Sequence, residues 1–132
     1  MIISKWIASA CVCASLAIGC GGGSGGSGVD GTIELVELDA GEAADLCDYI
    51  VDVLGPERTV DCGDGVMITV GGEDAAECVD DFDTFPATCT ATVDNAEACA
   101  EALGALSDAQ LCADDSFPAA CAPLISGTCG GG

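Results

Sequence analysis

The sequence contains no histidine, and its only basic residues are Lys5 and Arg58. Serine and cysteine nucleophiles of the common hydrolases are activated by a histidine, so catalytic systems of that kind cannot be built from this chain. Paired carboxylates remain a route to hydrolysis, but they need a cleft, and a chain of 132 residues offers little room for one. We therefore expect a protein that is not an enzyme and that needs no cofactor.

The sequence also lacks closely spaced metal ligands. After residue 20, no two cysteines lie closer together than Cys121 and Cys129, which excludes the C-x-x-C patterns of thiolate zinc sites, redox motifs and haem attachment. Carboxylates cluster at Asp80, Asp81 and Asp83, yet no EF-hand pattern accompanies them. We predict no dedicated metal site, with these three aspartates as weak candidates for calcium.

Positive charge is almost absent, and negative charge is abundant. All 23 acidic residues follow residue 19, and Arg58 is the one basic residue in that part of the chain, which gives it a net charge of −22. Such a surface repels nucleic acids and anionic lipid headgroups. It favours basic proteins or divalent cations as partners, although solubility alone also accounts for it.

The N-terminus has the pattern of a secretory signal. Residues 1–5 carry one positive charge, and residues 6–18 form an apolar run. Because a membrane-spanning helix needs about 20 apolar residues, this run is too short to cross a bilayer but long enough for a signal sequence. An ordinary cleaved signal and an uncleaved anchor are the alternatives to a more specific interpretation.

That interpretation comes from the residues that follow, Leu16-Ala17-Ile18-Gly19-Cys20 and then a Gly/Ser run. They resemble the lipobox of bacterial lipoproteins, although Ala17 stands where that family prefers leucine. The resemblance implies that Cys20 is acylated with fatty acids such as palmitate, becomes the first mature residue and anchors the chain in a membrane. Gly21, in place of aspartate, favours the outer over the inner membrane.

Removal of the signal leaves eight cysteines besides Cys20. They are Cys47, Cys62, Cys78, Cys89, Cys99, Cys112, Cys121 and Cys129. An even number in an oxidising compartment predicts four disulfides, for which 105 pairings are possible. The chain then divides into a signal peptide (1–19), the lipidated cysteine with its Gly/Ser tether (20–30), a disulfide-linked acidic domain (31–129) and a glycine tail (130–132).

Hydrophobic spacing and turn residues predict mainly helices with one β-hairpin. Apolar residues fall on one face of a helix over residues 39–54, and Gly63-Asp64-Gly65 indicates a turn between strands at 59–62 and 66–70. Residues 29–38 are predicted as an extended arm or edge strand. Further helices are expected at residues 73–82, 94–106 and 107–113.

Two segments of the chain are similar to one another. Residues 76–89 and 110–121 each contain a cysteine, Asp-Asp, and then Phe-Pro-Ala-x-Cys. We interpret this unit as a duplicated structural element in which Phe85 and Phe117 fill the core. If the copies fold alike, the simplest pairing is local, Cys78 with Cys89 and Cys112 with Cys121.

The sequence thus predicts a mainly α, disulfide-rich small domain. The predicted function is that of a non-enzymatic cell-envelope lipoprotein with a structural or protein-interaction role. The alternative is a module on the cell surface that binds calcium or a basic partner protein.

Overall fold

The computed structural model describes residues 26–113 and 117–130. Its elements follow the chain in the order η1 (Leu35–Glu37), α2 (Ala40–Leu54), β1 (Arg58–Asp61), β2 (Met67–Val70), α3 (Ala75–Phe82), α4 (Val93–Gly104), α5 (Asp108–Leu111), η2 (Ala119–Cys121) and α6 (Ala122–Ile125). The predicted fold class, a small and mostly helical disulfide-rich domain with one β-hairpin, is confirmed.

Capping boxes define where the helices begin. At the start of α2, the Asp39 carboxylate accepts from the Glu42 backbone N–H at 2.9 Å, and the Glu42 carboxylate accepts from the Asp39 N–H at 3.0 Å. The same reciprocal arrangement precedes α3, α4 and α5. Each box satisfies backbone donors that the first helical turn leaves unpaired. Gly55, with φ of 72°, ends α2 as the Gly-Pro sequence predicts.

The hairpin is antiparallel, with Arg58 paired to Val70 and Asp61 to Met67. Its turn runs through Gly63, Asp64 and Gly65, all with positive φ, which confirms the turn that the sequence indicates. Strand β1 begins and ends one residue earlier than predicted, and β2 begins one residue later. Cys62 and Val66 instead close the turn, where the Cys62 N–H donates to the Val66 carbonyl at 2.9 Å.

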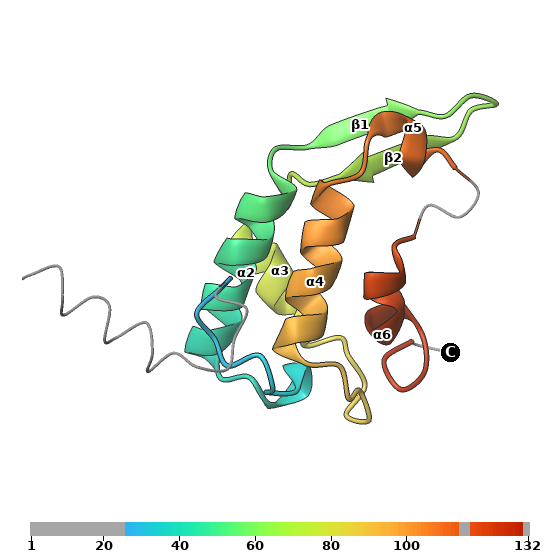
Figure 1. Cartoon of the computed structure of the whole chain (residues 1–132). Coiled ribbons are helices and arrows are strands. Elements are labelled where there is room, and N and C mark those ends of the chain that lie inside the picture. The colour runs from blue at the N-terminus through green and yellow to red at the C-terminus, as the bar shows by residue number, and fades with distance from the viewer. Residues whose placement is uncertain (1–25, 114–116, 131–132) are drawn as a thin grey trace, which may run out of the picture.

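Helix α2 packs on both α3 and α4, and η2 with α6 packs on α4 (Figure 1). The hairpin and α5 lie at the end of the molecule where α2 and α4 finish (Figure 1). The largest fully buried side chains are Leu46, Val93, Cys47, Cys89 and Cys121. Since three of these five are half-cystines, disulfide sulfur takes much of the space that large apolar side chains fill in other cores.

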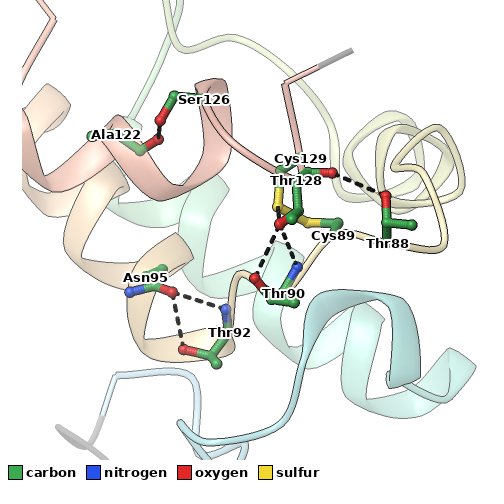
Figure 2. The surroundings of a disulfide bond; sticks show 9 residues. All are labelled: Thr88, Cys89, Thr90, Thr92, Asn95, Ala122, Ser126, Thr128 and Cys129. Carbon is green, nitrogen blue, oxygen red and sulfur yellow. Dashed lines mark hydrogen bonds between the residues drawn. A yellow bond between two sulfur atoms is a disulfide. The ribbon is translucent and has the colours of Figure 1, made fainter. Parts of the chain in front are cut away.

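The disulfides connect elements that are distant in sequence. They are Cys47–Cys78 between α2 and α3, Cys62–Cys112 between the hairpin and α5, Cys99–Cys121 between α4 and η2, and Cys89–Cys129 between the segment before α4 and the C-terminal segment. Around the last of these, the Thr128 hydroxyl lies 3.0 Å from that of Thr90 and accepts from the Thr90 backbone N–H at 3.1 Å (Figure 2).

The local pairing predicted from the repeat is therefore wrong. Cys78 is buried on the face of α3 that packs against α2, so its Cα lies 5.7 Å from that of Cys47. Cys89 lies beyond the end of α3, where the chain meets the C-terminal segment and Cys129. Cys78 and Cys89 therefore face different neighbours, Cys47 of α2 and Cys129 of the C-terminal segment.

The two phenylalanines of the repeat also differ. Phe85 packs against the core and its ring stacks on that of Phe82, with the centroids 6.1 Å apart. Phe117, predicted to fill the core, is instead 61% exposed. The disulfide of Cys121 to Cys99 fixes the second copy against α4, so Phe117 lies at the surface and not beneath a helix.

Residues 29–38 are extended only in part. Glu34 forms a single antiparallel bridge with Thr92, supported by backbone hydrogen bonds from Leu35 to Ala91 and from Val93 to Ile33. The chain then turns into η1, which the sequence did not predict. Helix α5 covers Asp108–Leu111 and is therefore shorter than the helix predicted over residues 107–113.

Candidate functional site

The predicted lipid attachment residue, Cys20, and the whole signal peptide (1–19) lie outside the described residues. The eight other cysteines are all in disulfides, as the sequence predicts. Four disulfides in one small domain indicate an extracytoplasmic protein. No helix in residues 26–113 and 117–130 is long and apolar enough to cross a bilayer.

Gly26 and Ser27, which follow Cys20 in the predicted tether, lie against the helices. Ser27 donates its backbone N–H and its hydroxyl to Glu97 Oε1 of α4, at 2.8 and 2.5 Å. Glu97 is only 2% exposed, so these hydrogen bonds help to satisfy a carboxylate inside the fold. A Cβ at Gly26 would lie 2.8 Å from Cζ of Tyr49, so the chain passes too close to α2 for a side chain at this position.

The end of the predicted tether is therefore part of the folded domain. The sequence predicted the domain to begin at residue 31. Ser27, which belongs to the predicted tether, gives hydrogen bonds to the buried Glu97 on α4. Beside this contact, the Tyr49 hydroxyl donates to Glu101 Oε1 at 2.5 Å. That hydrogen bond, with burial and the negative charges of Glu101 and Glu97, raises the pKa of Tyr49 to about 12.

The weak calcium candidates are not brought together. Asp80 and Asp81 line an open depression of about 510 Å³, which we call the acidic hollow. Asp83 lines a different depression, beside Asp39 and Phe82. Within the described part of the chain, no three histidine, cysteine, aspartate or glutamate side chains are placed to hold a metal ion.

The acidic hollow is lined by α3 and by two connecting segments, one between α2 and β1 and the other between β2 and α3. Its residues are Glu57, Gly71, Gly72, Glu73, Glu77, Asp80 and Asp81. Burial raises the pKa of Glu73 above its ordinary value near 4.5, and a hydrogen bond to Asp81 and the negative charges of Asp81, Glu77 and Asp74 raise it further. Burial is the largest of these causes, and the neighbouring carboxylates add to it.

A second depression, which we call the apolar hollow, has a volume of about 390 Å³. Its side chains come from the ends of α2 and α4, from β2 and α5, and from the segment before η2: Leu54, Ile68, Thr69, Val70, Gly71, Leu103, Leu111 and Phe117. The sequence interpretation missed this site because it assigned Phe117 to the core. The lining ranges from the buried Leu111 to the exposed Phe117, so apolar surface continues from the interior to solvent.

Arg58, the one basic residue after residue 19, is engaged in the fold. Its guanidinium donates to the Leu106 carbonyl at 3.0 Å and lies 3.4 Å from the Asp108 carboxylate. Arg58 thereby connects β1 to the segment that carries α5. It lines neither the acidic hollow nor the apolar hollow, so the acidic residues there are not neutralised by it.

Comparison with known proteins finds no matching family model, no similar curated protein and no similar solved structure. The fold and its disulfides therefore define the class of protein as far as a disulfide-linked extracytoplasmic domain. The more particular function has to be argued from the residues of this chain.

Proposed function

We propose that this protein is a non-enzymatic lipoprotein of the bacterial cell envelope, with a structural or protein-interaction role. The observation that carries the proposal is the order of the chain: a lipobox-like segment ending at Cys20, a short Gly/Ser run, and a domain with four disulfides. A lipobox requires export, and disulfides form in the compartment to which export leads.

The attachment segment supports an anchor close to the membrane. Six peptide units separate Cys20 from Gly26, and an extended chain spans at most about 3.6 Å per residue, so the folded domain stays within about 20 Å of the lipid. Two or more acyl chains on one cysteine hold a protein firmly, whereas a single chain binds reversibly. The glycine after Cys20 makes the outer membrane the proposed location.

The interaction role is supported by the surface. Acidic side chains cover a domain whose one basic residue is engaged with Asp108, and two depressions of opposite polarity share a boundary at Gly71. A basic partner protein therefore fits the charge better than an acidic one. Among the described residues no set of ligands converges on a calcium site. We therefore propose a basic protein as the partner.

The experiment is an intact mass measurement on protein extracted from its own membrane fraction, with and without reduction and alkylation. We expect a mass that begins at Cys20, carries acyl groups, and gains eight alkyl groups only after reduction. A Cys20→Ser variant should lose the acyl mass and leave the membrane fraction. An unacylated mass, or alkylation before reduction, would overturn the proposal.

A further inference from the structure

The apolar hollow and the acidic hollow lie next to each other. Gly71 lines both, and the residues on either side of it belong to one or the other: Val70 to the apolar hollow and Glu73 to the acidic hollow. The connecting segment between α2 and β1 is arranged in the same way: Leu54 lines the apolar hollow and Glu57 lines the acidic hollow. A hydrogen bond of 3.1 Å from the Gly72 N–H to the Gly55 carbonyl holds these two connecting segments together.

Apolar exposure at this place is substantial. Phe117 is 61% exposed, although it is one of only three phenylalanines in a sequence with few large side chains. An aromatic ring at the surface of a depression lined by leucine, isoleucine and valine is typical of a binding site, because exposed apolar patches on small domains are otherwise limited.

The charge around this surface selects its occupant. A second copy of the mature chain carries the same net charge of −22 and would be repelled, and a fatty acid or an anionic lipid would place its headgroup against carboxylates. Glu57, Glu73, Glu77, Asp80 and Asp81 all line the neighbouring depression with no basic side chain among them. A positively charged occupant gains attraction where any of the others meets repulsion.

We propose that the two hollows together bind a basic, amphipathic segment of a partner protein, with an apolar side chain in the apolar hollow and lysine or arginine against the acidic hollow. This inference rests on the interaction role proposed above and names the surface and the chemistry of the partner. Binding places a cation beside Glu73, Glu77, Asp80 and Asp81, which line the acidic hollow. The apolar contact supplies affinity, and the charges supply selectivity and a fast encounter.

The test uses the full mature chain in phosphatidylcholine nanodiscs and a synthetic peptide, Ac-Gly-Leu-Arg-Leu-Arg-Gly-amide, titrated by calorimetry at 50 and 150 mM salt. We expect saturable binding that Phe117→Ser weakens about fivefold at both salt concentrations. The pair Glu57→Gln and Asp80→Asn should weaken binding about threefold at the lower salt and less at the higher, because salt screens exposed charges.

Matched controls test whether the surface is specific. Ile125→Ser removes an apolar side chain that is 52% exposed elsewhere, and Asp48→Asn with Asp52→Asn removes two exposed charges from α2. Both should leave the affinity within about twofold. Equal losses in the control variants, equal binding of a peptide with serines for leucines, or binding of a peptide with glutamates for arginines would overturn the proposal.

Other occupants would give other results. Concentration-dependent dimers in sedimentation that compete with the peptide would assign the surface to a second copy, and displacement of the peptide by oleate would assign it to lipid; either overturns the proposal. The intact mass of the same preparation reports the anchor separately. Peptide binding by an unacylated chain would therefore support this inference while the anchor fails.

Discussion

Ser27 gives two hydrogen bonds to a single oxygen of Glu97, from its backbone N–H at 2.8 Å and its hydroxyl at 2.5 Å. The glutamate is 2% exposed and belongs to α4, while the serine belongs to the Gly/Ser run that follows Cys20. The contact joins the attachment segment to the helices. It therefore restricts how the domain can move relative to the site of the proposed anchor.

Ser27→Ala removes the hydroxyl donor and keeps the backbone donor. A hydrogen bond to a partly buried charged group is worth about 1–3 kcal/mol, so we expect the free energy of unfolding to fall by about that amount. Urea denaturation followed by circular dichroism measures it. Thr32→Ala is the control, because its hydroxyl donates to an exposed carboxylate, Asp30, and its loss should be smaller. Equal losses in the two variants would contradict a buried contact at Ser27.

Tyr49 is the only tyrosine in the chain, so its ionisation can be followed by ultraviolet absorbance without interference from another. The pKa of about 12 lies above the ordinary value of 10, so the stabilising contribution is complete below pH 10 and is lost as pH rises toward 12. At pH 11 about one tenth of the folded protein should be ionised, against about nine tenths of the chain unfolded in urea.

Glu101→Gln should lower the Tyr49 pKa toward 10, because it removes the negative charge that accepts the hydrogen bond from the hydroxyl. The measurement is the change in absorbance at 295 nm within seconds of a jump to pH 11, before disulfides degrade. A wild-type protein that titrates like the unfolded chain would show that the hydrogen bond is not present in solution.

Gly71 occupies the boundary between the two hollows with φ of +77°, and a Cβ there would lie 2.6 Å from the Gly55 carbonyl oxygen. Gly71→Ala therefore meets both a strained backbone conformation and a clash with main-chain atoms. Gly63→Ala isolates the first effect, since Gly63 has φ of +84° with no atom within 4 Å of the added Cβ.

We expect Gly63→Ala to cost about 1 kcal/mol of unfolding free energy, and Gly71→Ala to cost at least about 1 kcal/mol more. Thermal unfolding of both variants at one pH measures the difference. Identical losses of unfolding free energy would mean that the segments around Gly55 and Gly71 do not lie as close together as in the structure.

The sequence predicted the helices well where local signals act alone. Asp39 with Glu42 and Ser107 with Gln110 are capping pairs at the spacing that begins a helix, and both are present. The prediction from sequence was wrong where tertiary packing determines which residues meet. The repeat predicted Phe117 in the core and Cys78 with Cys89, but which face of α3 meets α2 is not encoded in the local pattern of either copy.

The two hollows were missed for the same reason. Each forms where segments separated in sequence meet: the end of α2, the residues after β2, and either α3 or the ends of α4 and α5. The recurring order of an apolar residue followed three positions later by glutamate, at Leu54 and Glu57 and again at Val70 and Glu73, is visible in the sequence. Its meaning depends on the hydrogen bond between Gly72 and Gly55, which places the two segments side by side.

The Cys89–Cys129 disulfide holds the C-terminal segment, and threonine hydrogen bonds also join this segment to the one before α4 (Figure 2). Closing a loop of 40 residues stabilises a fold by about 4 kcal/mol in the chain-entropy description. Cys89→Ala with Cys129→Ala should lower the free energy of unfolding by about that amount, measured with guanidinium chloride under non-reducing conditions.

The pairing itself can be checked by digestion with pepsin at low pH, where disulfides do not exchange. Mass spectrometry should find peptides containing Cys89 linked to those containing Cys129, and Cys99 linked to Cys121. A linked peptide with Cys78 and Cys89, or with Cys112 and Cys121, would contradict the structure and restore the local pairing that the repeat suggested.

Glu73 gives the acidic hollow a stability that depends on pH. Because its folded pKa is raised above the unfolded value, its contribution is fully present below about pH 4.5 and is lost as pH rises through the folded pKa. Glu73→Gln removes this ionisation, so the melting temperature of the variant should rise relative to that of the wild type as pH goes from 4 to 7.

Asp81→Asn should reduce the same pH dependence, since Asp81 is both the hydrogen-bond partner and a source of repulsion. Melting curves of the three proteins across this range measure the effect, and parallel curves would contradict a raised pKa of Glu73 in the folded protein.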